Sequence, residues 1–581
     1  MNNKIGINFV ACFGEEERKP IEEYLSGIDK AQLLKISSYF LGINPEKSEY
    51  SDVMAFLHMF FSPENTEFKD AIFSNIVDFV QNGPYPLELY EIPYVKSSLY
   101  LFEYIFDKIP EDQATTKTQV EMERDIFKAY VSLNQSVITE YEEKRRAIDE
   151  ARNRSLTSSE VMLANSFHNS DLINFREDKL FSCQLLRAFY YFEFLSEREE
   201  CKALLEAFYK NYGVKDYKEY LRRLLGITYP VLMKDREAHT EIHLELEEHA
   251  SFLDKHIIEI GEEITEVDFL TVRSKPLYKF EPNKYRVVYP LFVIEMIYNG
   301  LYFRLRAIND DLPDEHKVKK LYDLKTYEYS EQYVLSKILK EIYGKRYIQK
   351  SGKELDAILP GAPDYYVRNG KYVHLYESKD ILVKKEAKQS TDYDELTEDL
   401  KLKLVENQQG KRKAVRQLVE SIRKLITQEA TYDVNFPVKK AQIFPILVLH
   451  YRMFNAAGFN AVINTWFKEE LQLLEGDGLD ITKVHDLLVI DIETLIFNKE
   501  ALKSGKITIQ EAIIEYERDY LKFDVTQAKA SSQDELFNIS QNASTPFSFF
   551  LDNKVGKLKL NRSTRELLTK AFTLFEDNEN G

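Results

Sequence analysis

The sequence is poor in the residues on which disulfide-bonded, zinc-binding and low-complexity proteins depend. Of its 581 residues, three are cysteine, one is tryptophan, 20 are glycine and 17 are proline. Three cysteines cannot build a disulfide framework and no Cys-x-x-Cys pair indicates zinc, so a reducing, cytoplasmic location is expected. The low glycine and proline contents favour an ordered globular protein.

Several common motifs are also missing. No apolar run approaches the ~20 residues that a membrane-spanning helix needs, so no membrane partner is expected. The sequence contains no Gly-x-x-x-x-Gly-Lys-Ser/Thr phosphate loop and no Gly-x-Ser-x-Gly nucleophile elbow. These absences argue against a P-loop ATPase and against a serine hydrolase of the elbow type.

The net charge of −18 is divided unevenly along the chain. Residues 1–319 contain 39 Lys+Arg and 56 Asp+Glu, whereas residues 320–581 contain 39 and 40. Phosphate backbones bind to basic surfaces, so nucleic acid is expected on the C-terminal portion. The acidic N-terminal portion is expected to contact protein, either a partner or a second copy of the chain.

The length exceeds what one hydrophobic core usually supports and predicts two or three domains. Residues 1–315 are predicted to form a mainly helical, acidic accessory or regulatory region that could contain two subdomains. An acidic turn at 310–315 is taken as its boundary. Residues 320–500 then form a second domain, and residues 501–581 form a helical C-terminal extension.

Four histidines lie in an acidic stretch of the N-terminal region, namely His239, His243, His249 and His256. His239 and His243 are four residues apart and could chelate a transition metal from one helical face. The usual His-Glu-x-x-His order is absent, however, and the other two have a different helical phase. A polar helix with scattered histidines is the preferred interpretation, and metal binding at this cluster stays open.

The most informative pattern is a hairpin that follows Asp364. Asn369-Gly370 lies between two apolar runs, which predicts a type I′ turn with φ > 0 at both residues. Pairing outward from that turn places Asp364 opposite Leu375 on the second strand.

Side chains alternate between the faces of a strand, so Asp364, Glu377 and Lys379 are expected on one face. Glu377 would be a diagonal neighbour of Asp364, about 7–8 Å away at the backbone. Two carboxylates can hold a hard divalent ion, and an ammonium group can orient water or offset developing negative charge. A surface hairpin with a solvated Glu-Lys pair is the alternative interpretation.

The flanking segments predict a mixed α/β core. Residues 330–344 are predicted to form a helix with Ser330 as N-cap and Gly344 as stop, which puts Glu331 in the first turn, where the helix dipole favours an anion. After the hairpin we expect, in order, an exposed connection (380–409), a basic helix (410–426), a buried strand (442–450), a helix (461–474) and a second buried strand (486–491).

This order of elements, with Pro363-Asp364 and Glu377-Ser378-Lys379, resembles the PD-(D/E)XK nuclease superfamily over roughly residues 320–500. The resemblance implies an α+β fold, in which a mainly helical N-terminal portion precedes a restriction-endonuclease-like core with a mixed central sheet. It also implies that Asp364 and Glu377 bind Mg²⁺, or Mn²⁺ in its place, with the Ser378 carbonyl assisting. Lys379 would position the attacking water.

In this family an acid on a helix precedes the hairpin. Glu331 occupies that place, although Glu341 could take the role. The implied activity is metal-dependent endonucleolytic hydrolysis of a phosphodiester bond that leaves a 5′-phosphate. DNA is expected rather than RNA, because most relatives cut DNA. By analogy, large nucleases joined to an unfamiliar partner domain often belong to bacterial anti-phage or restriction systems.

Basic residues gather after the hairpin. Six cations lie between Lys411 and Lys424 with a single acid, which fits either a solvated helix face or a surface for backbone phosphates. A second basic segment covers residues 345–353. The candidate nucleic-acid-binding residues are Lys411, Arg412, Lys413, Arg416 and Gln417, the last matching a functional glutamine in several members of the family.

A function of another class also stays open. The chain could be a catalytically silent nuclease-fold scaffold, or a nucleic-acid-sensing protein that binds a partner protein. The acidic bulk of the chain favours that alternative, whereas the joint presence of Asp364, Glu377 and Lys379 favours catalysis.

Overall fold

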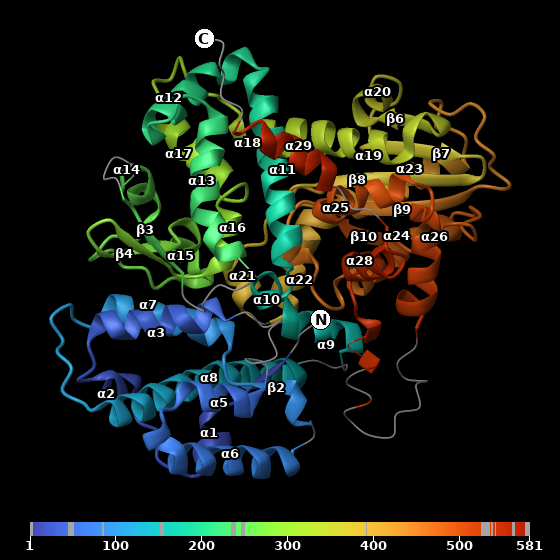
Figure 1. The fold of residues 1–581 in the computed structure, drawn as a ribbon. Coiled ribbons are helices and arrows are strands. Elements are labelled where there is room, and N and C mark those ends of the chain that lie inside the picture. Colours follow the sequence, from blue (N-terminus) through green and yellow to red (C-terminus); the bar gives the residue numbers. More distant parts are fainter. Residues whose placement is uncertain are drawn as a thin grey trace. The chain divides into compact units, whose positions relative to one another are not determined.

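The computed structural model describes residues 4–43, 52–83, 86–151, 156–233, 240–245, 250–390, 392–523, 535, 539–540, 542–560 and 564–575 (Figure 1). They form two compact units. Unit 1 contains residues 1–147, 208–301 and 530–535, and unit 2 contains residues 148–207, 302–529 and 536–581. The predicted boundary near 315 is close to the change of unit at 301–302, but residues 148–207 of the predicted N-terminal region belong to unit 2.

Unit 1 is mainly helical, as predicted (Figure 1). Its elements, of which α8 and α12 extend into unit 2, are α1 (Phe9–Phe13), α2 (Ile21–Leu25), α3 (Lys30–Gly42), α5 (Val53–Phe60), α6 (Thr66–Gln81), α7 (Val95–Lys108), α8 (Gln119–Ala151), α12 (Lys202–Tyr212), α13 (Tyr217–Leu232), α14 (Ala250–Leu253), α15 (Leu270–Ser274) and α16 (Pro290–Glu295). A short parallel pair joins β1 (Ile5–Gly6) and β2 (Tyr90–Glu91), and a small antiparallel sheet has the order β3 (Glu241–His243), β5 (Lys284–Val287), β4 (Leu277–Glu281).

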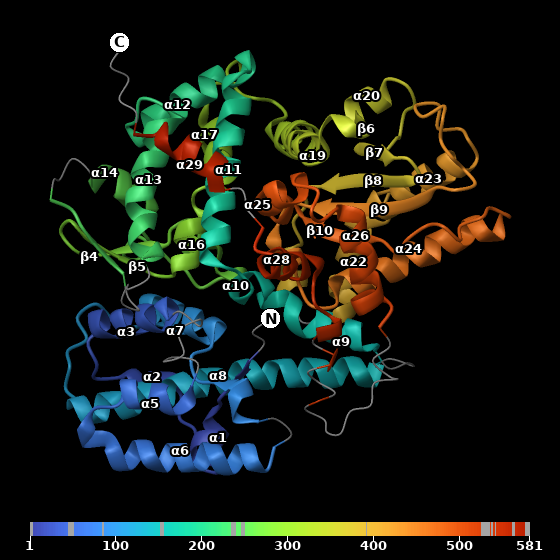
Figure 2. The ribbon, with the colours of Figure 1, turned by 45° about the vertical axis from the view of Figure 1, so that its right-hand side comes forward.

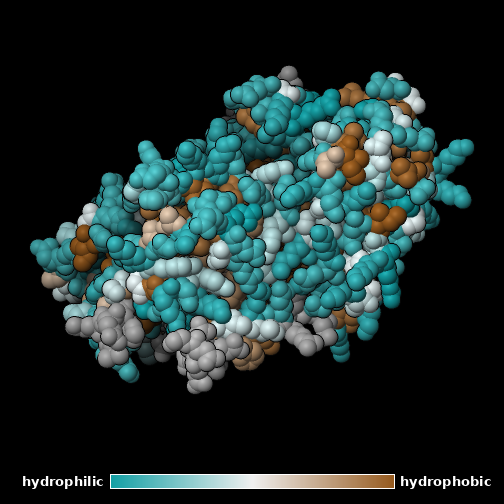
Figure 3. Space-filling view, turned by 90° about the horizontal axis from the view of Figure 1, so that it is seen from above, coloured by the Kyte–Doolittle hydropathy of each residue, from teal (hydrophilic) through white to brown (hydrophobic). Residues whose placement is uncertain are grey.

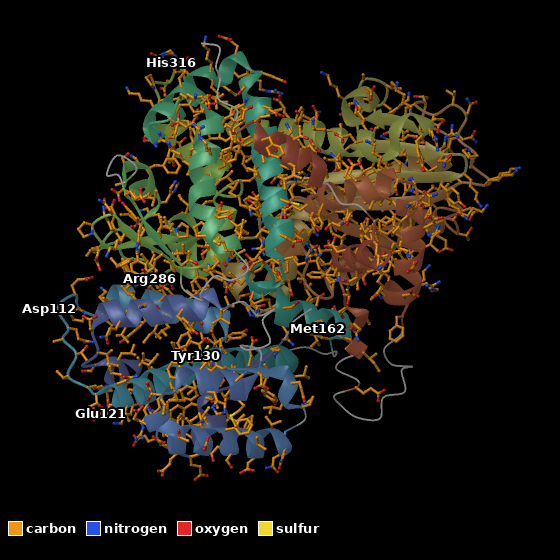
Figure 4. The ribbon with its side chains drawn as sticks, viewed as in Figure 1. Asp112, Glu121, Tyr130, Met162, Arg286 and His316 are labelled. Atoms are coloured by element: carbon orange, nitrogen blue, oxygen red, sulfur yellow. The ribbon has the colours of Figure 1, made fainter. Side chains whose placement is uncertain are left out.

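Aromatic side chains fill the helical core of unit 1. The ring of Phe40 on α3 lies 4.5 Å from that of Tyr130 on α8 and 6.1 Å from that of Phe56 on α5. Tyr130, labelled in Figure 4, is buried, and its hydroxyl lies 2.6 Å from the Ser98 hydroxyl on α7. The abundant phenylalanine and tyrosine of this unit therefore serve packing between helices.

Within the described residues 240–245, the histidine-rich stretch forms a strand instead of the expected polar helix. His243 is on strand β3, where its ring lies 3.2 Å from the Glu241 carboxylate, and Glu241 in turn accepts hydrogen bonds from Arg286 on β5 (Figure 4). His256 is buried, with its ring stacked on that of Tyr212. His239 and His249 lie outside the described residues. The cross-strand pair of Glu241 with Arg286 thus stabilises a strand where the sequence pattern predicted a helix.

A five-stranded mixed sheet forms the centre of unit 2, as expected. Its strand order is β10 (Leu488–Asp491), β9 (Gln442–Leu449), β8 (Tyr372–Lys379), β7 (Tyr365–Asn369), β6 (Ile348–Ser351). The strands β10, β9 and β8 are parallel, whereas β7 is antiparallel to both of its neighbours. β9 is buried along nearly its whole length, which explains its continuous apolar sequence.

Helices cover both faces of this sheet (Figure 2). On one face, Tyr366, Val373 and Leu375 pack with apolar residues of α22 (Tyr393–Leu404), α23 (Ala414–Ile426) and α24 (Phe459–Gly476). On the other, Tyr376 lies with residues of α25 (Ile492–Lys503), α26 (Ile509–Tyr516) and α28 (Phe547–Lys557). Within the predicted extension at 501–581, α26 and α28 are therefore part of the layer that covers the sheet.

The remaining helices of unit 2 are α9 (Ser158–Ser166), α10 (Ser170–Ile173), α11 (Glu177–Ser196), α17 (Leu301–Asp311, which begins in unit 1), α18 (Leu321–Asp323), α19 (Leu335–Tyr343), α20 (Gly352–Asp356), α21 (Lys385–Gln389) and α29 (Thr564–Phe572). The expectation of an exposed connection at 380–409 is wrong, because the charged residues of α22 alternate with Leu396, Leu400 and Leu404, which are buried.

The helix before the hairpin starts earlier than expected. It runs through α18, a π-helical segment η8 (Leu324–Val334) and α19, and ends at Gly344 (φ 61°) as predicted. Ser330 and Glu331 are therefore within a helix rather than at its start. Ser330 is not an N-cap, because its hydroxyl donates a hydrogen bond to Asp380.

The surface is largely hydrophilic on the face drawn in Figure 3, with hydrophobic residues in small separate patches. None of the helices in the described ranges is both long and apolar enough to cross a membrane.

Candidate active site

The hairpin turn differs from the predicted type I′ turn by one residue. Asn369 pairs with Tyr372, so Gly370 (φ 58°) and Lys371 form the loop, with glycine in the first central position as in a type II′ turn. This shift moves every partner by two residues and leaves the two faces of the strands unchanged. β7 begins at Tyr365, which pairs with Tyr376; extending this register by one residue places Asp364 opposite Glu377 instead of diagonal to it.

Four predicted site residues converge at this end of the hairpin. The ammonium nitrogen of Lys379 lies 2.8 Å from Glu377 Oε1 and 3.5 Å from both Asp364 Oδ2 and Glu331 Oε1. Asp364 Oδ2 also accepts a 2.7 Å hydrogen bond from the Ser378 amide. Glu377 is almost fully buried, whereas Asp364, Glu331 and Lys379 each retain some contact with solvent.

Between the two acids considered on the preceding helix, the structure brings Glu331 to the site. Glu341 lies three turns further along and pairs instead with Lys499 at 2.7 Å. Glu331 belongs to the π-helical segment η8, and such segments occur frequently at functional sites.

A buried contact that the sequence reasoning missed fixes Glu331 in place. Asp380 follows the strand end directly, and its carboxylate lies 2.7 Å from Lys325 Nζ and 2.5 Å from the Ser330 hydroxyl. Although burial acts to raise the pKa of Asp380, the ammonium of Lys325 outweighs it and lowers that pKa. Asp380 therefore joins η8 to β8 and positions the helix that carries Glu331. The sequence contained one indication of this contact. Lys325 and Ser330 are five residues apart, and π-helical hydrogen bonding brings residues with that spacing to one side of the helix.

A glycine contacts the backbone of Asp364. The backbone N–H of Gly352 donates a 2.7 Å hydrogen bond to the Asp364 carbonyl, and a Cβ at this position would lie only 3.0 Å from that oxygen. Any larger residue at this position would crowd the Asp364 backbone, which would have to shift by a few tenths of an ångström.

The electrostatics of the cluster favour an additional positive charge. Burial and, next, the charge of Asp364 raise the pKa of Glu331 to about 9 and that of Glu377 to about 8. Burial acts to lower the pKa of Lys379, but the three carboxylates outweigh it and the pKa is raised. One ammonium thus faces three carboxylates, and like charges this close ionise together only when a cation offsets them.

The donor set fits a divalent ion with two protein ligands. Glu377 Oε1 is buried and lies 2.8 Å from the Lys379 ammonium. Across the described part of the chain, no three Asp, Glu, His or Cys side chains form a ready-made metal-holding group. Mg²⁺ is commonly held by one or two carboxylates with water and substrate phosphates completing its shell, so Asp364 and Glu377 suffice.

Ser378 points to the opposite face from Glu377 and Lys379. Its hydroxyl lies 2.9 Å from His450 Nε2 at the end of β9, and burial lowers the pKa of His450 to about 3. The Ser378 side chain therefore helps to hold the strand ends together, while the role of its carbonyl stays a prediction.

The basic segment at 411–424 is less available than its composition indicates. Its three arginines form ion pairs: Arg412 with Glu420, Arg416 with Glu406 and Glu470, and Arg423 with Glu420 and Glu429. The lysines differ. Lys411 is exposed, and the pKa of Lys413 is lowered by partial burial and then by the ammonium groups of Lys411 and Lys379.

Lys413 thus lies beside the carboxylate cluster. Gln417 follows it by one turn on the same face of the helix and is partly buried. Of the five predicted nucleic-acid contacts, Lys411, Lys413 and Gln417 are therefore better placed than Arg412 and Arg416.

The second basic segment divides between the two ends of the sheet. Ser351 pairs with Tyr365 at the site end of the hairpin, so Lys350 and Lys353 are near the cluster. Ile348 pairs with Arg368 at the turn end. Because a strand rises about 3.3 Å per residue, Lys345 and Arg346 lie more than ~10 Å further away and are poorly placed to contact the same phosphates.

No protein-family model, curated protein or solved structure matches the chain. The functional reasoning therefore rests on the geometry of the site.

Proposed function

We propose that the protein is a Mg²⁺-dependent endonuclease that hydrolyses phosphodiester bonds of DNA. The observation that carries the proposal is the position of Lys379, whose ammonium lies within 3.5 Å of carboxylates from both hairpin strands and from the preceding helix. This combination of side chains suits metal-assisted hydrolysis of a phosphodiester, because carboxylates can hold the ion and the ammonium can offset negative charge.

The residues divide the work as follows. Asp364 and Glu377 would hold the ion, which supplies Lewis-acid stabilisation of charge on the phosphate and lowers the pKa of water. Lys379 donates hydrogen bonds to the attacking water and to a phosphate oxygen. Glu331 forms a 3.5 Å ion pair with Lys379 and would contact the ion directly or through water. Asp380 acts as a positioning residue by holding Glu331.

Water attacks phosphorus in line with the bond to the leaving oxygen, and that bond breaks as the new P–O bond forms. The resemblance to PD-(D/E)XK nucleases supports a 5′-phosphate on one product and a 3′-hydroxyl on the other. It also supports DNA as substrate and, by analogy, a part in bacterial anti-phage or restriction defence. The three free cysteines support a cytoplasmic location.

The charge of the two units supports a division of labour. Unit 1 contains 28 Lys+Arg and 43 Asp+Glu, whereas unit 2 contains 50 and 53. Nucleic acid should therefore bind to unit 2, and the acidic unit 1 should contact a partner protein or a second copy of the chain.

The test is cleavage of plasmid and of labelled oligonucleotides with Mg²⁺ or Mn²⁺, with and without EDTA. Lys379→Ala should reduce the rate by about 100-fold or more, as removal of one electrostatic stabiliser does in other enzymes. Lys371→Ala, an exposed lysine at the turn of the same hairpin, is the matched control and should cut normally. Equal cleavage by wild type and Lys379→Ala would place the chemistry elsewhere.

One observation favours the silent-scaffold alternative. Lys379 itself offsets part of the charge of the carboxylates, so the cluster could persist without metal. Calorimetric titration with Mn²⁺ distinguishes the nuclease from the silent scaffold. Stoichiometric binding that Asp364→Asn abolishes supports the enzyme, whereas no binding and no cleavage of DNA or RNA supports the scaffold.

A further inference from the structure

An exposed aromatic strip leads to the candidate active site. It consists of Phe303 on α17, Tyr322 on α18 and Tyr327 on η8, whose side chains are 49%, 57% and 46% exposed. Large aromatic residues are usually buried, so three exposed rings on neighbouring helices call for a specific explanation.

The strip has a buried anchor. The ring of Tyr302 is nearly buried and lies 5.4 Å from that of Phe303 and 6.4 Å from that of Tyr322. Lys325, whose ammonium lies 5.6 Å from the Tyr302 ring, is the same residue that pairs with Asp380. The helices that carry the strip are thus fixed to the end of β8.

The inner end of the strip is beside the carboxylates. Tyr327 precedes Glu331 by four residues on η8, which places both on one side of the π-helical segment. Burial, followed by the charges of Asp356, Asp364 and Glu331, raises the pKa of Tyr327, as expected for a phenol close to those acids.

Cations flank the strip. Lys319 and Lys320 are exposed immediately before α18, and Lys413 lies beside the carboxylate cluster. Exposed rings with lysines near both ends of the strip suit a polyanion that also offers flat apolar faces, and they suit an apolar peptide poorly.

We infer that the aromatic strip binds single-stranded DNA by stacking on its bases and leads the unpaired strand to Lys379. The inference rests on the proposed function and adds a substrate class to it. In a duplex the base faces are stacked on one another and hidden, so rings on a protein surface can stack only on unpaired bases. The lysines provide the contacts with phosphate that track the backbone.

Binding tests the inference without cleavage. The fluorescence anisotropy of a labelled oligo-dT and of a duplex of equal length would be measured with the full chain in EDTA. Wild type should bind the single strand more tightly than the duplex. Tyr327→Ala and Tyr322→Ala should each weaken single-strand binding by roughly 5- to 100-fold, the range that one stacked base contributes, and leave duplex binding unchanged.

Two variants control for side effects. Tyr327→Phe keeps the ring and should bind as wild type does. If the Tyr327 hydroxyl alone were responsible for binding, this variant would bind weakly. Phe572→Ala removes an exposed aromatic side chain of the same unit outside the strip and should have no effect. Equal binding by Tyr327→Ala, Tyr322→Ala and wild type overturns the inference.

Failure of the inference and failure of the proposed function give different results. If wild type cuts duplex DNA in Mn²⁺ and the strip variants cut it equally well, with no preference for single strands, the nuclease stands and the inference falls. If the protein binds and cuts RNA but not single-stranded DNA, the substrate class assigned here is wrong. If no nucleic acid is bound or cut, both proposals fail.

Discussion

Glu331→Gln offers a direct test of whether the carboxylate cluster is held together as described. In the metal-free protein the pKa of Glu331 is about 9, against an ordinary value of 4.5. Between these two values the folded state binds more protons than the unfolded state, so stability falls as pH rises from about 4.5 to 9. Glutamine cannot ionise, and the variant should lack this part of the pH dependence.

The size of the effect follows from the same numbers. From the ordinary pKa of 4.5 to pH 7.5 the folded state keeps its extra proton over about 3 pH units, which would lower the stability by ~4 kcal/mol if Glu331 titrated alone. Coupling to Glu377 and access of solvent reduce this, and we expect ~2 kcal/mol. Glu331→Gln should therefore be more stable than wild type by about that amount at pH 7.5 in EDTA, and equal to it near pH 4.5.

Urea denaturation followed by tryptophan fluorescence suits the measurement. Trp466 is the single tryptophan, lies on α24 and is buried, so its emission reports on the unfolding of unit 2. Glu341→Gln is the matched control, because Glu341 is paired with Lys499 and should lose stability when neutralised. If the free energy of unfolding varies with pH in the same way for wild type and Glu331→Gln, the pKa of Glu331 is not raised by the neighbouring carboxylates and the reasoning is refuted.

Three further predictions follow from other parts of unit 2. Lys413→Gln should reduce the slope of log affinity for DNA against log salt concentration by about one unit between roughly 50 and 200 mM. Arg423→Gln should leave the slope unchanged, because Arg423 is already paired with two glutamates. An unaltered slope for Lys413→Gln would show that Lys413 makes no contact with phosphate. Gly352→Ala should lower cleavage while the metal-free protein loses little stability, because the new Cβ pushes on the Asp364 carbonyl. Unimpaired cleavage would show that the close contact between residue 352 and Asp364 is unimportant. Burial lowers the pKa of His374 to about 3, so wild type should lose stability as pH falls below about 6.5; urea denaturation at pH 5 and pH 7 should show a smaller loss for His374→Phe, and equal losses would contradict the assignment.

The hairpin shows why the site was predictable although its register was not. The choice between the turn Asn369-Gly370 and the turn Gly370-Lys371 depends on backbone dihedrals that differ by little free energy. Either choice shifts the pairing by an even number of residues, so the period of two keeps Asp364, Glu377 and Lys379 on one face. The faces of a strand are encoded locally, whereas the partner opposite each residue is not.

The helix before the hairpin could be predicted only in part. Its stop at Gly344 is a local signal, because glycine readily adopts φ > 0. Its start was misplaced because Ser330, an apparent N-cap, uses its hydroxyl for Asp380, a residue fifty positions away. The partners of Arg412 and Arg416 were hidden for the same reason, since a count of cations cannot reveal acids that approach from other elements.

The packing of α11 and α28 has a consequence for the way the protein is made. Arg187 of α11 forms a buried 2.8 Å ion pair with Glu493 of α25, and α28 packs on β10. A chain limited to residues 320–500 would leave Glu493 buried without Arg187, and breaking such a pair costs about 3–5 kcal/mol. The sheet that carries Asp364 and Lys379 therefore completes its packing only after residue 557 has left the ribosome. At about 5–20 residues per second, the nascent chain spends roughly 3–13 seconds with its strands made but the helices that cover one face, up to α28, still missing. During that interval an incomplete chain should be unable to cut the nucleic acid beside which it is being synthesised.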